Sequence, residues 1–217
     1  MTAPRVFALH KPRGVVCSAV GEGGATPVYE LLPPDVRGWF AVGRLDKESE
    51  GLLLFSDDAA FAQRLMDPGG VAKTYEVVVE GLPDEDALAP MRAGGGAMEG
   101  RVLRPVEVTR LGKAPRGGTR LRVVLHEGVN REIRRLFRAA GHKVRRLKRV
   151  AVGPVGLGEL KEGEGREISA RERELLEAAL AARGAGAAAR QTGISPSGRE
   201  RSGGGSHRGA RPRDSKL

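Results

Sequence analysis

Seven apolar or alternating segments, separated by turn residues, constrain the fold of this chain more than any other feature. They lie at residues 5–12, 39–46, 52–58, 73–81, 101–111, 119–128 and 143–153. Runs of this length that are rich in Val, Leu, Phe and Thr are typical of β-strands. Helical patterns fall between them, and Asp57 or Asp58 can cap the helix that starts near residue 59. The order of the segments favours an α+β fold over an all-β fold.

The C-terminal region divides into a helix and a tail. Ser169 and Glu172 form the S-x-x-E pattern of a capping box, which predicts a helix start. The apolar stripe expected to dock this helix consists of Leu175, Leu176, Ala179 and Leu180. Residues 183–217 are rich in Gly, Ser, Ala and Arg and have little to bury. We therefore expect one folded domain at 1–182 and a disordered basic tail at 183–217.

Several classes of protein are excluded by what the sequence lacks. Cys17 is the only cysteine, and no Cys/His pair has the spacing of a zinc site. The glycine clusters lack the context of a nucleotide-binding loop. Neither a signal peptide nor an apolar run of about 18 residues is present. We expect a cytoplasmic protein that needs no metal, no cofactor and no membrane.

The net charge of +10 is concentrated in two segments. Residues 131–149 contain nine Lys or Arg and one Glu, and residues 184–217 contain seven Lys or Arg and two acidic residues. These two segments carry all of the excess positive charge. Focused positive charge is the footprint of a polyanionic partner such as a nucleic acid.

The first of these segments predicts an amphipathic helix that ends at Gly141. At 100° per residue its apolar face consists of Ile133, Leu136, Phe137 and Ala140. Arg134 falls nearest the apolar edge, where a guanidinium can pair with a buried carboxylate. The three arginines that point further outward are Arg131, Arg135 and Arg138. A merely solvated helix face is the alternative, but the near absence of acids favours contact with a nucleic-acid backbone.

The same helix could in principle enter the major groove of DNA. Polar base-reading residues such as Asn or Gln are absent from it, which disfavours sequence readout from duplex DNA. The chain also has few aromatic residues, so an RNA reader built on many stacking platforms is not expected.

Two further residues are ambiguous when taken alone. Asp46 ends the stretch AVGRLD before a charged turn, where an aspartate is common for conformational reasons. Tyr75 lies in KTYEVVVEG and shares one strand face with Val77 and Val79. An aromatic residue among valines is usually part of a core. Their combination with the basic helix changes this interpretation.

Four segments, taken together and in order, resemble one protein family. They are HKPRGVVCS, AVGRLDKESEGLLLFSDD, KTYEVVVEG and LHEGVNREIRRLFRAAGHKVRRLKRVAVGPVGLGEL. They are similar to the ribosomal pseudouridine synthases of the RsuA type over roughly residues 5–168. The resemblance implies a mixed, mainly antiparallel sheet in two subdomains, at about 1–63 and 64–182, flanked by helices with a catalytic cleft between them.

The resemblance also implies roles for the matched residues. Asp46 matches the catalytic aspartate, and Tyr75 matches the tyrosine that stacks on the target base and takes the C5 proton. Arg134 matches the basic residue that pairs with the aspartate, and Leu147 matches a packing leucine near the site. We further expect contacts with substrate or RNA from Arg44, Lys73, Asn130, Arg131, Arg135, Arg138 and Lys148.

The chain departs from the family pattern at a few positions. Glu132, Ser49 and Leu136 stand where relatives often have Gln, Thr and Met. None of these changes removes a reactive group. Many relatives also carry a small N-terminal RNA-binding domain of the S4 type, whereas here the catalytic pattern begins within ten residues of the start. We therefore expect docking on RNA to rely on residues 131–149 and on the tail.

The implied activity is conversion of uridine to pseudouridine in ribosomal RNA, 23S in preference to 16S. The isomerisation gains and loses no atoms, which agrees with the lack of any cofactor motif. The expected substrate is a ribosomal RNA hairpin, either free, in an assembly intermediate or in a subunit, and the expected enzyme is a monomer. The alternative is a non-catalytic ribosome-assembly factor on the same scaffold, which would explain the charge but not the joint presence of Asp46, Tyr75 and Arg134.

Overall fold

The computed structural model describes residues 3–21, 23–67, 70–94, 97–98, 100–102, 106–126, 128–129 and 131–191. The strands in these ranges are β1 (Val6–Lys11), β2 (Phe40–Ala41), β3 (Glu50–Ser56), β4 (Lys73–Glu80), β5 (Ala97–Met98), β6 (Arg101–Val102), β7 (Glu107–Ala114), β8 (Gly118–Leu125), β9 (Val144–Val152), β10 (Val155–Gly156) and β11 (Gly165–Glu167). The helices are the 3-10 turn η1 (Val28–Leu31) and α1 (Ala59–Met66), α2 (Glu85–Ala93), α3 (Glu132–Ala139) and α4 (Ala170–Gln191).

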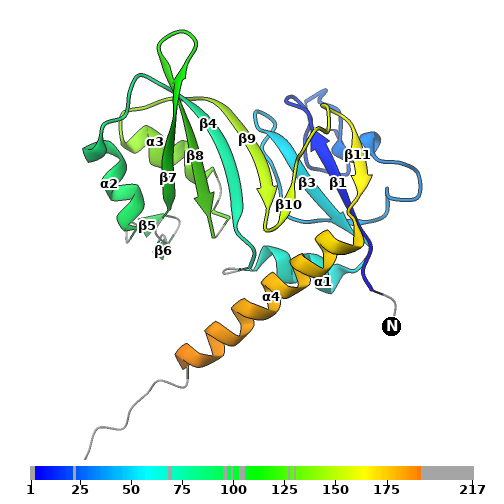
Figure 1. The fold of residues 1–217 in the computed structure, drawn as a ribbon. Coiled ribbons are helices and arrows are strands. Elements are labelled where there is room, and N and C mark those ends of the chain that lie inside the picture. Colours follow the sequence, from blue (N-terminus) through cyan, green and yellow to red (C-terminus); the bar gives the residue numbers. More distant parts are fainter. Residues whose placement is uncertain are drawn as a thin grey trace, which may run out of the picture.

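A nine-stranded mixed sheet organises most of the described residues (Figure 1), and β5 and β6 form a separate two-stranded sheet. The strand order of the nine-stranded sheet is β11-β1-β3-β9-β4-β8-β7, while β2 pairs with β3 and β10 pairs with β9. All of the pairings are antiparallel except the one between β3 and β9. The predicted α+β class with a mainly antiparallel sheet is confirmed.

Two apolar cores lie on opposite faces of this sheet. The larger core packs side chains of β4 and β9, such as Val77 and Leu147, against Ile133 and Phe137 of α3. The smaller core packs Leu54 of β3 against α1 and α4. In Figure 1, α2 and α3 lie beside the half of the sheet formed by β9, β4, β8 and β7. Helix α1 and the start of α4 lie below the other half, and α4 then runs downward and to the left.

The C-terminal elements return to the N-terminal half of the sheet. Strand β11 pairs with β1, and Leu176 of α4 is fully buried in the core that contains Val6 and Leu54. Both elements lie within the expected second subdomain at 64–182, and they pair and pack with residues of the expected first subdomain at 1–63. The physical reason is that the edge of β1 offers unpaired backbone groups, which β11 satisfies.

Strands β3 and β9 join the two halves of the sheet through a short parallel pairing. Glu50 lies opposite Lys148, and Gly51 lies opposite Arg149. Gly51 has a φ of 110°, and a Cβ atom added to it would lie 2.2 Å from the carbonyl oxygen of Arg149. Only glycine fits this crossing. The glycine that precedes LLLF in the sequence is therefore required where the two halves meet.

Two expected strands are interrupted in the structure. Of residues 39–46, only Phe40–Ala41 forms a strand, because the chain turns at Gly43 with a φ of 76°. Residues 101–111 contain the separate strands β6 and β7. In both cases the observed strands are shorter than the segments expected from the sequence. A strand-like pattern of residues does not by itself show where backbone pairing ends.

The predicted helix caps are largely confirmed. Asp58, not Asp57, caps α1 by accepting a hydrogen bond from the backbone N–H of Phe61 at 2.9 Å. In α4 the capping box forms, because Glu172 accepts from the backbone N–H of Ser169 at 2.8 Å and donates its own N–H to Ser169 Oγ at 3.1 Å. Of the expected stripe, Leu175 is 39% exposed and does not dock.

Helix α4 continues to Gln191, past Arg183 where we expected the tail to begin. The sequence from Ala182 onwards is rich in Ala and Arg, which are good helix formers. Residues 192–217 lie outside the described residues, so the expected disorder of the tail stays a prediction. Across the described part of the chain, no helix combines the length and the apolar character that crossing a membrane demands.

Candidate active site

A cleft of about 690 Å³ opens where the two halves of the sheet meet. It is lined from one half by the loop that carries Asp46 and from the other by strands β4 and β9 and the start of α3. Six of the predicted site residues line it, namely Arg44, Asp46, Lys73, Tyr75, Arg131 and Leu147. The cleft thus collects residues that are far apart in the sequence.

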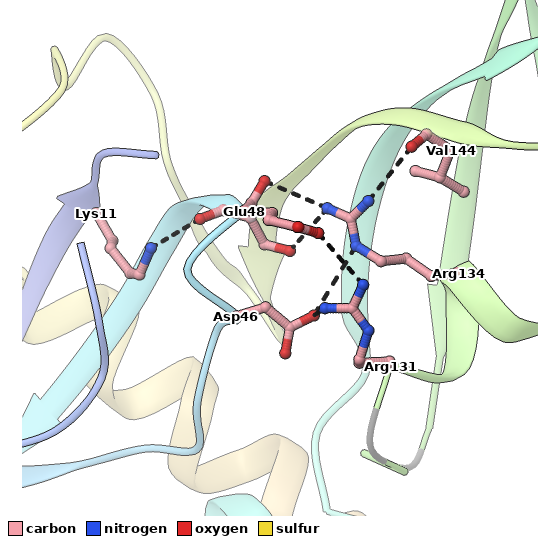
Figure 2. A network of polar contacts seen from close by, with 7 residues as sticks. Lys11, Asp46, Glu48, Arg131, Arg134 and Val144 are labelled. Carbon is pink, nitrogen blue, oxygen red and sulfur yellow. Dashed lines mark hydrogen bonds and ion pairs between the residues drawn. The ribbon is translucent and has the colours of Figure 1, made fainter. Parts of the chain in front are cut away.

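Asp46 is held at the turn between β2 and β3. The backbone N–H of Ser49 donates to the carbonyl of Asp46 at 2.9 Å, which closes the turn. The Oδ2 atom of Asp46 lies 3.3 Å from Nη1 of Arg131 and 3.9 Å from Nε of Arg134 (Figure 2). The side chain of Asp46 is one-third exposed, so its carboxylate faces the cleft between two guanidinium groups.

Arg134 is the more deeply placed of the two arginines, with a side chain only 12% exposed. It donates to the carbonyl of Val144 at 3.3 Å, to the carbonyl of Glu48 at 3.2 Å and to Ser49 Oγ at 3.3 Å. Burial lowers the pKa of Arg134 from its usual value. Arg134 thus lies on α3 beside the carboxylate of Asp46.

Ser49 shows why one departure from the family pattern is harmless. Its hydroxyl accepts the hydrogen bond from Arg134, as a threonine hydroxyl would. Glu132 is a second departure from the family pattern. Glu132 is 2% exposed, and its carboxylate accepts a hydrogen bond from the backbone N–H of Val129 at 3.2 Å. This buried carboxylate also lines the cleft.

Arg131 does not point outward as the helical pattern predicted. It precedes the helix as the N-cap residue, with a left-handed backbone at φ 52° and ψ 28°, so the 100° spacing does not apply to it. Its guanidinium reaches Asp46 through Nη1 and Oε2 of Glu48 through Nη2 at 3.2 Å. The hydrogen bond from Arg131 lowers the pKa of Glu48. Figure 2 shows this fork over both carboxylates.

Tyr75, Leu147 and Lys73 form the wall of the cleft on the second half of the sheet. Tyr75 and Leu147 project from β4 and β9 into the larger core and are 8% and 6% exposed. Lys73, at the start of β4, is 6% exposed and also lines the cleft. An aromatic ring and an aliphatic side chain beside a carboxylate suit a flat, partly apolar group such as a nucleobase.

The remaining predicted RNA contacts lie away from the cleft or cannot be placed. Arg138 is exposed on α3, and Arg135 is half-buried on the same helix. Lys148 follows Leu147 in β9 and therefore faces the other side of the sheet. Asn130 lies outside the described residues. The structure therefore separates residues at the cleft from residues that can only bind a larger ligand around it.

Sequence reasoning missed three charged residues beside Asp46. Lys11 is fully buried beneath the turn, where its Nζ donates to the carbonyl of Ser49 at 2.8 Å, and burial lowers the pKa of Lys11. Arg149 is 2% exposed and donates through Nε to the carbonyl of Leu52 at 2.7 Å. The third residue is Glu48. The sequence offered one indication of such a buried cation, which is that Lys11 ends the apolar run VFALHK.

Comparison with known proteins places this site in a family. Residues 5–139 match the RNA pseudouridylate synthase family. The chain belongs to that family. Within this pseudouridine synthase, the matched region includes Asp46, Tyr75 and Arg134 together with most of the cleft lining.

Curated relatives support the assignment over a longer stretch. The ribosomal large subunit pseudouridine synthase B of Bacillus subtilis is 35% identical over 81% of this chain and 72% of its own length. The enzyme of the same name from Pseudomonas aeruginosa is 38% identical over 79% of this chain and 45% of its own length. This chain therefore spans about half to three-quarters of these relatives. The predicted resemblance to ribosomal enzymes of the RsuA type is confirmed.

Solved structures agree with the fold. A crystal structure of a pseudouridylate synthase superposes with a TM-score of 0.71 at 30% identity, covering 80% of this chain and 74% of that chain. A chain of an archaeal box H/ACA sRNP shares the fold at 21% identity with a TM-score of 0.52, covering 71% of this chain and 50% of that chain. The expected pseudouridine synthase fold is confirmed.

Proposed function

We propose that this pseudouridine synthase isomerises a specific uridine of ribosomal RNA, in the 23S molecule rather than the 16S molecule. The observation that carries the proposal is Asp46, whose carboxylate lies at the cleft between Arg131 and Arg134 and shares its lining with Tyr75. Relatives named for the large ribosomal subunit support the choice of RNA. The substrate is a ribosomal RNA hairpin, bound by a monomer.

The reaction requires one nucleophile and an environment that retains the severed base. It breaks the bond between N1 and C1′, turns the uracil and joins C5 to C1′. C5 then loses its proton and N1 takes one up from solvent, so no atoms are gained or lost. The bond that the nucleophile forms with the substrate breaks again before the product leaves. Asp46 acts as the nucleophile, and attack at either C6 or C1′ requires its ionised form. Arg131 and Arg134 favour that charged form by direct Coulomb attraction.

The apolar wall of the cleft supplies the rest of the chemistry. The ring of Tyr75 stacks on the uracil. Its hydroxyl oxygen acts as a general base, accepting the C5 proton while its own proton passes to solvent. Leu147 packs beside the ring and excludes water from the base while it turns. Exclusion of water prevents simple hydrolysis of the broken glycosidic bond.

The basic outer surface of α3 can stabilise RNA from which the target uridine has been flipped out of its stack. Flipping a base out of a helix costs a few kcal/mol, and least in a loop or bulge. Contacts of Arg135 and Arg138 with the RNA backbone can offset this cost, since both lie on the helix that carries Arg134. A structured hairpin with an accessible loop uridine is therefore the fitting substrate.

The decisive experiment maps pseudouridine in ribosomal RNA from cells with and without the gene. The deletion strain is rescued with wild type, with Asp46→Asn, or with Asp35→Asn as a matched control at an exposed aspartate that pairs with Arg5. We expect one site to disappear and to return with wild type and the control but not with Asp46→Asn. A deletion that loses no site would instead support the non-catalytic assembly factor.

A further inference from the structure

The two arginines that hold Asp46 differ in how firmly they are themselves held. Arg134 is 12% exposed and donates to three oxygen atoms besides its contact with Asp46. Arg131 is 42% exposed and forms ion pairs with the carboxylates of Asp46 and Glu48. Exposed ion pairs contribute little to stability and are easily exchanged. Arg131 is therefore the cation that another anion can capture.

The backbone of Glu48 is held by a hydrogen bond, whereas its side chain is exposed. Its carbonyl oxygen accepts from Nη2 of Arg134 at 3.2 Å, so the residue stays beside the catalytic turn. Its carboxylate lies 3.2 Å from Nη2 of Arg131, is 55% exposed and does not line the cleft. Glu48 thus occupies the outward-facing side of the Arg131 guanidinium, next to the cleft.

We propose that Glu48 is a positioning residue, which holds Arg131 beside Asp46 in the free enzyme and gives it up to a backbone phosphate of the bound RNA. The proposal rests on the proposed function, because it takes RNA as the ligand. A phosphate offers a planar guanidinium two strong, charge-assisted hydrogen bonds. It therefore replaces an exposed carboxylate while Nη1 keeps its contact with Asp46.

This exchange would place a phosphate next to the catalytic carboxylate without moving the turn. The backbones of Asp46 and Glu48 stay in position because they are held by Arg134 and by the hydrogen bond from Ser49 to Asp46, and only the carboxylate of Glu48 moves away. The phosphate takes the site of the Glu48 carboxylate at the edge of the cleft, so the attached nucleoside can enter the cleft. Glu48 competes with the RNA, and its removal strengthens RNA binding only through Arg131.

A double-mutant cycle tests this coupling. The four proteins are wild type, Glu48→Gln, Arg131→Met and the double variant, each titrated into a fluorescein-labelled RNA hairpin with one loop uridine. We expect Glu48→Gln to tighten binding by about two- to fivefold when Arg131 is present. In the Arg131→Met background the same substitution should leave the Kd unchanged. In steady-state kinetics, Glu48→Gln should lower KM and leave kcat unchanged.

A matched control separates this exchange from a general change in charge. Glu76→Gln removes the same charge from an exposed position on β4. Glu76→Gln should change the Kd only slightly, and by the same factor with and without Arg131. Equal tightening by Glu48→Gln with and without Arg131 would show that Glu48 acts only through the overall field, and no tightening at all would equally overturn the proposal. Thermal melting of each variant confirms that all of them are folded.

The binding cycle and the proposed function can fail separately. Pseudouridine formation in transcripts of ribosomal RNA is measured with the same proteins. Absence of product with wild type would count against the proposed function, whereas the coupling between Glu48 and Arg131 is decided by the Kd values for the hairpin alone.

Discussion

The Nε atom of Arg134 lies 3.9 Å from Oδ2 of Asp46, although Asp46 lies in the turn before β3 and Arg134 lies on helix α3. Arg134 also donates to the carbonyl of Val144, at the start of β9, and to the carbonyl of Glu48, in the turn that follows Asp46. One largely enclosed guanidinium therefore connects the carboxylate of Asp46, its turn and strand β9. Under the proposed function, the reaction and the packing of α3 against this turn depend on the same side chain.

Replacement of Arg134 by Ala should abolish turnover while RNA affinity falls only modestly. The substitution removes a positive charge beside Asp46 and leaves the carbonyl of Val144 without this donor. We expect kcat to fall by at least about 10²-fold, the loss typical of one electrostatic contact at a reacting group.

Arg138 provides the comparison, because it is exposed on the same helix and does not line the cleft. Arg138→Ala should weaken RNA binding and reduce the slope of log Kd against log salt by about one unit, with kcat preserved. Titrations at several salt concentrations and single-turnover kinetics measure both effects. Similar kinetics for the two variants would contradict the assignment of Arg134 to the reacting centre.

Tyr75→Phe should reduce turnover and leave the fold intact. The ring of Tyr75 packs in the larger core and would remain in place, so thermal melting should be nearly unchanged. Loss of the hydroxyl removes the proposed general base, for which we expect a fall in kcat of about 10²–10⁴-fold. Unchanged turnover would assign the proton transfer to another group and leave Tyr75 with stacking alone.

Gly51→Ala should destabilise the protein far more than an ordinary glycine substitution. A methyl group at Gly51 would lie 2.2 Å from the carbonyl oxygen of Arg149, where β3 meets β9. Gly112 is a matched control, since it has a φ of 135° but no atoms within 4 Å of an added Cβ. In denaturant unfolding, Gly112→Ala should cost about 1–2 kcal/mol, and Gly51→Ala should cost at least about 2 kcal/mol more. Equal costs would show that only backbone strain matters.

The start of α4 should contribute to stability in a defined range of pH. A hydrogen bond from Arg166, with further bonds from Ser169, lowers the pKa of Glu172 from 4.5 to about 2. Because the folded pKa lies below the unfolded value, the stabilisation is complete above about pH 4.5 and is lost as the pH falls toward 2.

The comparison of Glu172→Gln with wild type isolates this contribution. We expect the variant to be about 1–3 kcal/mol less stable at pH 7 and nearly equal to wild type at pH 2. Glu174→Gln, at an exposed glutamate that pairs with Arg171, should show no such dependence. Urea unfolding between pH 2 and 7 provides the measurement. A constant difference at all pH values would show that Glu172 acts through packing and not through its charge.

Local patterns in the sequence were sufficient for the elements and for part of the site. Strand alternation, the caps at Asp58 and Ser169 and the apolar face of α3 depend on residues a few positions apart, so they could be predicted. Asp46, Tyr75 and Arg134 could be proposed from motifs because each lies in a recognisable run. The structure then placed all three at one meeting point of the two sheet halves.

Errors arose where a backbone conformation or a distant partner decided the outcome. The left-handed backbone at Arg131 turned a residue expected on the outer face of the helix toward Asp46 and Glu48. The helix at residues 170–191 extends past residue 183, where the tail was expected to begin. The composition of this end of the helix is compatible with both a helix and a tail. Neither outcome can be derived from a fixed angular step along the chain.

The amino-acid sequence by itself determined which segments pair or coil and which chemical groups the protein carries, because these depend on local periodicity and residue type. Only the tertiary structure decided that Lys11 and Arg149 lie buried near the turn that follows Asp46, that β11 and α4 return to the first half, and that Glu48 shares Arg131 with Asp46. These relationships depend on distances between residues from different elements, and such distances are established only when the helices pack on the two faces of the sheet.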